Sequence, residues 1–270
     1  MQVIGICRFS YPAIGGFQVR STSLAERRAY LYDPDRMATR FALFEAFTLP
    51  SIRAQTDADF VFLIVVGDSL PRRYSERLRD LVKDIPQIVV QRHAPGPHRE
   101  VMNDALNALR SNKKAPCIQF RLDDDDAVAR GFVAELRRRA VPALQILEDS
   151  QAVAIDFNQG YIARPNAEGI EAAAVKESYW AAGMAIVTRP KSQQTIMSFS
   201  HNKIWQHIPT LTFTGTDMML RGIHPYNDSR QKTEPRPVQL QPLDAAGEVH
   251  FKMTYNIDAD NVRRLFSAPH

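Results

Sequence analysis

The chain has 270 residues, 44% of them apolar, and its 34 basic and 30 acidic residues leave a formal net charge of +4. That length can bury one large core, and so small a charge excess, spread along the chain, gives no reason to expect nucleic-acid binding. The longest apolar run, residues 60–66, is far shorter than the roughly 20 residues that cross a bilayer, and residues 1–6 lack the marks of a signal peptide. We therefore expect a cytoplasmic protein without a transmembrane segment, for which peripheral membrane association stays open.

From residue 1 to about 128, short apolar runs alternate with segments of helical period, a pattern typical of a parallel sheet flanked by helices. The runs expected to form buried strands are 3–7, 60–66, 88–91 and 117–122. Apolar stripes at helical spacing lie within 37–44, 78–85 and 102–109. The first of these stripes precedes Pro50. We predict an α/β fold with a mostly parallel central sheet flanked by helices, in which Cys7 and Cys117 are buried thiols.

After residue 128 the pattern is less regular. A helix is expected from about residue 130 until Pro142 interrupts its pattern, because proline removes a helical hydrogen bond. Further strands are expected at 153–157 and 184–187, and a short closing helix at 260–266. Residues 229–247 are rich in Pro, Gln and Arg and show neither period, so we expect a loop or arm there.

Four consecutive carboxylates, Asp123, Asp124, Asp125 and Asp126, directly follow the fourth expected strand. Ligands of open α/β sheets bind beyond the carboxyl ends of the strands, and four adjacent acids require a cation. If the chain stays extended, Asp123 and Asp125 lie on one side and Asp124 and Asp126 on the other. One such pair would suit Mg²⁺ or Mn²⁺, which often bind through one or two carboxylates and substrate phosphates. The alternative is an acidic turn that caps the following helix, for which one aspartate is enough.

Residues 122–126 resemble the aspartate-any-aspartate motif of the inverting glycosyltransferases with the A-type fold, and within them the putative rhamnosyltransferase family. Aligned in this way, Asp123 and Asp125 are the motif pair. Upstream, residues 98–106 resemble the Arg-Asn helix of these enzymes, although Arg and Asn are here separated by three residues. The resemblance spans most of residues 1–225, and it implies the Rossmann-like architecture of nucleotide-diphospho-sugar transferases.

The resemblance also implies residues that bind the donor. Arg8 and Ser10 fall where the fold places the nucleotide base and ribose, and Asp68 falls where many relatives accept the pyrimidine N3 hydrogen. Arg8, Arg99 and Arg121 would contact phosphate, because guanidinium groups form paired hydrogen bonds with phosphate oxygens. A turn residue is the alternative for Asp68, and a salt bridge is the alternative for Arg8 and for Arg121.

Further motifs point to the acceptor side. Residues 183–189 resemble the acceptor-side strand of the family, and residues 214–222 resemble its later Glu-Asp motif, with Thr216 where relatives often have Glu. By this resemblance Asp217 is the catalytic base. His224 lies near the position from which some members supply a histidine to the metal or diphosphate, and a purely structural histidine is the alternative.

Aromatic side chains near these motifs offer flat apolar faces on which a sugar ring could stack. They are Tyr179, Trp180 and Trp205. Core packing is the alternative for each of them.

The activity implied is that of a metal-dependent inverting glycosyltransferase. It would move a sugar, rhamnose by the family resemblance, from a nucleotide-diphosphate donor to a hydroxyl of a glycan or another acceptor. The metal, Mn²⁺ or Mg²⁺, would be held by Asp125 with His224, while Asp123 would bind the metal, its waters or the ribose, and Asp124 would join the donor-binding residues.

On this interpretation the chain is one domain, with a nucleotide-binding half at 1–128, an acceptor half at 129–228 and a loop-rich C-terminal arm at 229–270. Two other classes of function stay open. A magnesium-dependent nucleotidyltransferase would also place clustered aspartates beside a sheet. A non-catalytic calcium- or carbohydrate-binding module would use the carboxylates structurally.

Overall fold

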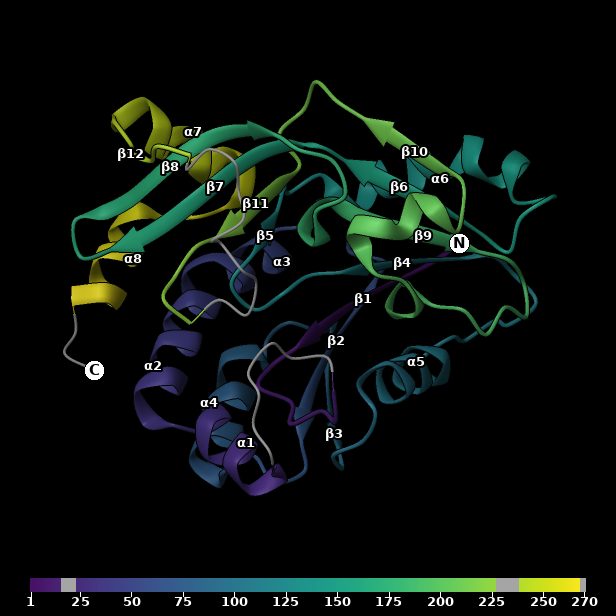
Figure 1. Cartoon of the computed structure of the whole chain (residues 1–270). Helices are drawn as coiled ribbons and strands as arrows, with labels where there is room; N and C mark the ends of the chain where they lie inside the picture. The colour runs from purple at the N-terminus through teal and green to yellow at the C-terminus, as the bar shows by residue number, and fades with distance from the viewer. Residues whose placement is uncertain (16–22, 227–237, 268–270) are drawn as a thin grey trace.

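The computed structural model describes residues 1–15, 23–226 and 238–267. Within them, one sheet consists of β1 (Gln2–Arg8), β2 (Val61–Gly67), β3 (Ile88–His93), β4 (Cys117–Arg121), β6 (Ala152–Phe157), β9 (Met184–Thr188) and β10 (Thr210–Phe213). The order is β10-β6-β9-β4-β1-β2-β3 (Figure 1). Neighbours run parallel except at β9, which is antiparallel to β4 and β6. The expected mostly parallel sheet is confirmed, and the expected strands are displaced by no more than about two residues at either end.

Helices cover both faces of this sheet (Figure 1). They include α1 (Leu24–Leu31), α2 (Pro34–Leu43), α4 (Arg72–Val82), α5 (His98–Ala108) and α6 (Phe132–Ile146). Alternate residues of β1 face opposite layers, so that Val3 and Cys7 join the core formed with α2, α4 and α6, whereas Ile4 and Ile6 pack with α5. Cys7 and Cys117 are both buried free thiols, as predicted.

The first long helix is followed directly by further helical turns, which contain Pro50. From α2 the chain continues through a π-helical turn, η1 (Phe44–Thr48), into α3 (Leu49–Arg53). In η1 the N–H of Leu49 bonds to the carbonyl of Phe44, five residues back, and this wider turn accommodates Pro50, which has no N–H to donate. The π turn also aims the Thr48 hydroxyl at the acidic segment that follows β4, as described below.

The prediction that Pro142 interrupts the next helix is wrong. Pro142 lies inside α6, which runs on to Ile146. Leu136, Ala140 and Ala143 on the same helix are fully buried. This packing against the sheet compensates for the backbone hydrogen bond that proline cannot form, because tertiary burial contributes most of a helix's stability in a folded protein.

A second sheet, which the sequence did not predict, lies beside the first. Its strands are β5 (Ala127–Val128), β7 (Gln159–Asn166), β8 (Gly169–Lys176), β11 (Met219–Gly222) and β12 (Gln241–Pro242). They follow the order β12-β8-β7-β11-β5 among the described residues. β5 begins directly after the acidic segment and pairs with β11, so this sheet brings the end of β11 close to the carboxyl end of β4.

The C-terminal residues are more helical than expected. Asp244 caps α7 (Ala245–Tyr255) by accepting a 2.7 Å hydrogen bond from Gly247, and α8 (Ala259–Ser267) confirms the expected closing helix. The arm was therefore wrongly expected to be loop-rich, since Phe251 and Tyr255 are fully buried. Residues 229–237 of the expected loop lie outside the described residues, and the division into two halves remains a prediction. No helix in the described parts of the chain has the length and apolar character needed to cross a membrane.

Candidate functional site

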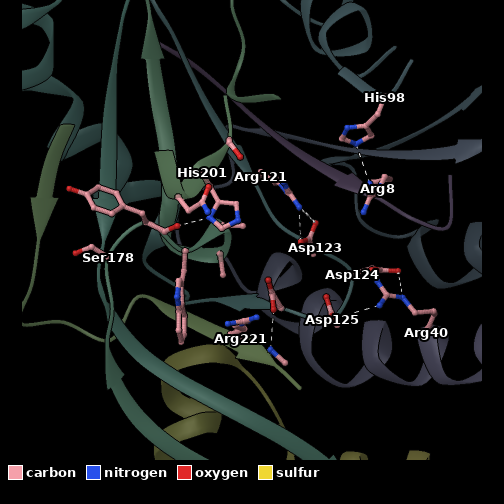
Figure 2. A pocket seen from close by; sticks show the side chains of 18 residues that line it. Arg8, Arg40, His98, Arg121, Asp123, Asp124, Asp125, Ser178, His201 and Arg221 are labelled. Atoms are coloured by element: carbon pink, nitrogen blue, oxygen red, sulfur yellow. Dashed lines mark hydrogen bonds and ion pairs between the residues drawn. The ribbon is translucent and has the colours of Figure 1, made fainter. Parts of the chain in front are cut away.

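A cavity of about 520 Å³ opens at the carboxyl ends of β1 and β4. Arg8 ends β1, Arg121 ends β4, and residues 123–126 follow directly. The wall opposite the acidic residues is formed by residues 178–182 and 200–202, and Figure 2 shows Ser178 and His201 on that side of the cavity. Charged groups contributed by distant segments thus meet at the sheet edge where a ligand site was expected.

Residues 123–126 form a tight turn, because the N–H of Asp126 donates to the carbonyl of Asp123 at 3.2 Å. The expectation of an extended segment with carboxylates on alternating faces is therefore wrong. Two further bonds hold the turn. The Thr48 hydroxyl donates to the Asp126 carbonyl at 2.7 Å, and the N–H of Gly222 donates to Asp126 Oδ1 at 3.0 Å.

Asp123 and Asp125 favour the charged form, although burial opposes it. Burial raises the pKa of Asp123, but the charges of Arg121 and Arg8 outweigh this and hold the pKa well below its ordinary value. The closest contact is 2.9 Å, between Arg121 Nη2 and Asp123 Oδ2. Burial likewise raises the pKa of Asp125, and Arg40 and His224 together lower it below its ordinary value. These two carboxylates are the pair that the motif predicts.

The other two carboxylates are structural in this arrangement. Asp124 is fully buried and forms an ion pair with Arg40 of α2, whose Nε lies 2.9 Å from Asp124 Oδ2. Burial and the charges of Asp125 and Asp123 raise the pKa of Asp126 well above its ordinary value, so its neutral form is favoured. Arg40 also lies 3.5 Å from Asp125 Oδ2 and therefore balances two adjacent carboxylates.

His224 contacts Asp125 directly. Its Nε2 lies 2.8 Å from Asp125 Oδ2, and its Nδ1 accepts the N–H of Tyr226 at 3.1 Å. The N–H of Tyr226 thus holds the ring so that Nε2 faces the carboxylate. Arg40 Nη1, which can only donate, lies 3.1 Å from the same Nε2. The role of His224 as a metal ligand stays a prediction.

Three further arginines join Arg40 around the cavity: Arg8, Arg121 and Arg221. Arg8 Nη1 donates to His98 Nε2 at 3.3 Å, and Arg221 lies over the ring of Trp180, 5.0 Å from its centroid. Burial, followed by the charges of Arg8 and Arg121, lowers the pKa of His98 to about 3, so its imidazole is neutral. The cavity therefore presents cationic groups and neutral donors to an anionic ligand.

Three predicted donor-binding residues lie outside this cavity. The buried Ser10 hydroxyl accepts a hydrogen bond from Arg36 at 3.1 Å. The Asp68 side chain is half exposed on the turn after β2, 3.9 Å from Arg28. Arg99 is exposed and lines a separate groove near Phe199. The structure therefore does not bring these three residues to the cavity, and their role in donor binding stays a prediction.

The predicted base, Asp217, also lies outside the cavity. Its Oδ1 accepts from the Gln159 amide at 3.0 Å, and its Oδ2 lies 3.1 Å from His250 Nε2. Asp217 precedes β11, whereas Arg221 and Gly222 at the other end of that strand reach the cavity. The segment with the motif thus reaches the cavity through Arg221 and Gly222, and the role of Asp217 as base stays a prediction.

Sequence reasoning missed several residues that line the cavity: Arg40, His98, His201 and Arg221. An arginine in the apolar stripe of α2 was an available signal for Arg40, since a buried guanidinium requires an anionic partner. Tyr179 and Trp180 do line the cavity, whereas Trp205 is 54% exposed and belongs neither to the cavity nor to the core.

The sheet order, with one antiparallel strand after β4 and an acidic turn at its carboxyl end, defines the Rossmann-like α/β class of the A-type glycosyltransferases. The sequence matches the family described as "Putative rhamnosyl transferase" over residues 2–236. The chain belongs to this family.

Solved structures with a similar fold have low sequence identity. TarS 1–349 of S. aureus in complex with UDP-GlcNAc is 10% identical with a TM-score of 0.45, over 84% of this chain and 60% of that chain. The nucleoside-diphosphate-sugar pyrophosphorylase of Vibrio cholerae RC9 is 13% identical with a TM-score of 0.35, over 79% of this chain and 92% of that chain. The chain thus spans about 60% of the length of that TarS structure. No curated protein matches the sequence.

Proposed function

We propose that the protein transfers rhamnose from a nucleotide-diphosphate donor to an acceptor hydroxyl, with inversion at the anomeric carbon and with help from Mn²⁺ or Mg²⁺. One observation carries the proposal. The acidic turn that follows β4 meets Arg8, Arg121 and Arg221 at a single cavity, at the sheet edge where α/β proteins bind ligands. The family match supports rhamnose as the sugar.

The residues present fit a divalent metal held jointly with the donor. Asp125 is buried beside the cavity, its pKa is lowered, and His224 and Arg40 fix its side chain. Among the described residues no three His, Cys, Asp or Glu side chains are grouped to hold a metal alone. Mg²⁺ and Mn²⁺ suit such a site, because they commonly take remaining ligands from substrate phosphates. When bound, the metal would supply a Lewis acid to the leaving diphosphate.

The chain's own arginines stabilise the same leaving group. When the bond from the anomeric carbon to the diphosphate breaks, negative charge builds on the departing oxygen. Arg8 and Arg121 flank Asp123, and their guanidinium groups can donate to phosphate oxygens as that charge develops. Asp123 holds Arg121 in place through a 2.9 Å ion pair. Because its side chain is still partly exposed, Asp123 can also contact the ribose or a metal-bound water.

The opposite wall of the cavity suits a sugar and its acceptor. Trp180 stacks with Arg221, which fixes the indole at the cavity surface, and Tyr179 lies next to it. An aromatic face of this kind packs against the apolar face of a sugar ring. The acceptor hydroxyl would approach from this side, away from the diphosphate, as inversion requires.

A thermal-shift panel tests the proposal. UDP-, dTDP- and GDP-sugars, including rhamnose donors, are added with and without Mn²⁺. One nucleotide should raise Tm only when the metal is present. The shift should be easy to measure, because a ligand at 100 times its Kd adds about 2.7 kcal/mol of stability. Stabilisation by Ca²⁺ alone, with no response to any nucleotide sugar, would favour a binding module. Release of pyrophosphate instead of nucleoside diphosphate would indicate a nucleotidyltransferase.

A further inference from the structure

His201 is held on the cavity wall by a single, directional hydrogen bond. It begins the 3₁₀ helix η4 (His201–Gln206), and its Nδ1 lies 2.5 Å from the carbonyl oxygen of Tyr179. A carbonyl oxygen can only accept, so Nδ1 must carry the proton. In the neutral ring the lone pair is then on Nε2, to which the structure assigns no hydrogen bond among the described residues.

The carbonyl that orients His201 is itself fixed from behind. Tyr179 has φ of 67°, in the left-handed region that non-glycine residues adopt only at an energetic cost. Its N–H donates at 2.9 Å to Oδ1 of Asp156, which is fully buried at the end of β6. Asp156 Oδ2 accepts the Thr212 hydroxyl at 3.1 Å. A buried carboxylate thus holds the strained backbone of Tyr179 through its N–H, and the carbonyl of the same residue holds the imidazole.

His201 lies on the wall opposite the acidic turn (Figure 2). Burial lowers its pKa, the hydrogen bond to Tyr179 opposes this, Arg121 and Arg221 lower it further, and Asp123 raises it. The net direction is downward, so the imidazole is neutral at neutral pH. An oriented neutral imidazole that faces a cavity has the properties of a general base.

We propose that His201 is the catalytic base that deprotonates the acceptor hydroxyl. This inference rests on the proposed function and deepens it. The arrangement follows the general logic of an oriented base, in which a third group fixes the tautomer so that the other nitrogen can accept a proton. Here a backbone carbonyl, locked by Asp156, is the orienting group.

The step balances without another reactant. The acceptor O–H gives its proton to His201 Nε2 while the acceptor oxygen forms a bond with the anomeric carbon. The bond from that carbon to the diphosphate oxygen breaks, and its electron pair leaves with the diphosphate. The imidazolium then returns its proton to water. Asp217, whose two oxygens are engaged by Gln159 and His250 away from the cavity, has no part in this step.

Release of nucleoside diphosphate from dTDP-rhamnose and UDP-rhamnose, with Mn²⁺ and with water or ethylene glycol as the acceptor, tests the proposal. Replacement His201→Gln keeps an amide that can donate to the Tyr179 carbonyl but removes the base. We expect kcat to fall by at least about 100-fold while KM changes by less than about twofold. In His201→Ala, added imidazole should restore at least about tenfold of the lost rate, because it can occupy the vacated space as a base.

Two variants sharpen the comparison. His207→Gln, an exposed histidine on the same segment, should leave kcat unchanged, and Asp217→Asn should retain it within about threefold. The proposal is overturned if His201→Gln keeps its kcat, if its loss appears in KM, or if imidazole fails to rescue His201→Ala. It is also overturned if Asp217→Asn alone abolishes release. If the native enzyme releases no nucleoside diphosphate from any nucleotide sugar, the proposed function itself fails.

Discussion

The imidazole of His224 and the carboxylate of Asp125 lie 2.8 Å apart, although 99 positions separate them in the sequence. The N–H of Tyr226 holds the ring of His224 from its other side, so that Nε2 faces Asp125. The histidine therefore sets the orientation of a carboxylate that faces the cavity. An orienting hydrogen bond of this kind commonly governs how well the carboxylate binds a metal.

Replacement of His224 by Gln should accordingly weaken the binding of Mn²⁺ in the presence of UDP or dTDP. We expect a loss of about 10- to 100-fold, because Asp125 keeps its charge but loses the partner that orients it. Titration of free Mn²⁺ by electron paramagnetic resonance measures this affinity directly. His207→Gln is the matched control. If His224→Gln binds Mn²⁺ as tightly as the native protein does, His224 does not orient Asp125 for metal binding.

Replacement of Arg40 by Met should destabilise the fold strongly. Arg40 is 9% exposed and pairs with the fully buried Asp124, so the substitution leaves a buried carboxylate without its cation. Loss of one partner from such a pair typically costs about 3–5 kcal/mol. Urea denaturation measures the free energy of unfolding. Arg72→Met is the control, since that side chain is 89% exposed in its pair with Glu76 and should contribute less than about 1 kcal/mol. Equal effects of the two substitutions would contradict the account.

The sequence predicted the central strands of the first sheet well because they are buried on both faces. Such strands appear as nearly continuous apolar runs, as in residues 60–66, and they can be found without any tertiary information. The position of the acidic residues, although not their turn conformation, was predictable for a related reason. Four consecutive carboxylates next to the buried residue Leu122 are unusual, because charged side chains normally lie on the surface. They therefore mark the end of β4 as a site.

The rest of the site depends on contacts between distant segments. The Arg40–Asp124 pair and the hydrogen bond from His201 to Tyr179 join residues whose types and spacing carry no common pattern. Asp217 was selected from a partial motif, and the direction of β11 decides which end of that motif faces the cavity. Pro142 also misled the prediction, because buried packing accommodated it inside α6.

Replacement of Gly222 by Ala should disturb the acidic turn. A Cβ at this position would lie 2.0 Å from the carbonyl oxygen of Asp125, so the turn or the end of β11 must move. Because backbone is involved, we expect nucleotide affinity in the presence of Mn²⁺ to fall by at least about tenfold, measured by calorimetry. Gly131→Ala is the control, since a Cβ there meets no atom within 4 Å. Native affinity in Gly222→Ala would show that the turn can shift without consequence.

Acidification should destabilise the protein through His98. Burial, with the charge of Arg8 beside it, lowers the pKa of His98 to about 3 in the folded chain, against an ordinary value of 6.5. Between these two pH values the unfolded chain binds a proton that the folded chain does not, so stability falls as pH falls below 6.5. Urea denaturation at pH 7.5 and pH 5 should show a smaller loss in His98→Gln than in the native protein. An identical loss in both would exclude His98 as a source of this dependence.

The most direct test of the account is the release of nucleoside diphosphate from a nucleotide-diphosphate rhamnose in the presence of Mn²⁺. The native protein should release it, EDTA should stop the release, and Asp125→Asn should lower kcat by at least about 100-fold, because the charge that holds the metal against the leaving diphosphate is lost. Asp84→Asn, which alters a carboxylate 63% exposed on the surface, should behave as the native protein does. Release that is unaffected by EDTA and by Asp125→Asn would contradict the claim that the acidic turn and a divalent metal act on the diphosphate.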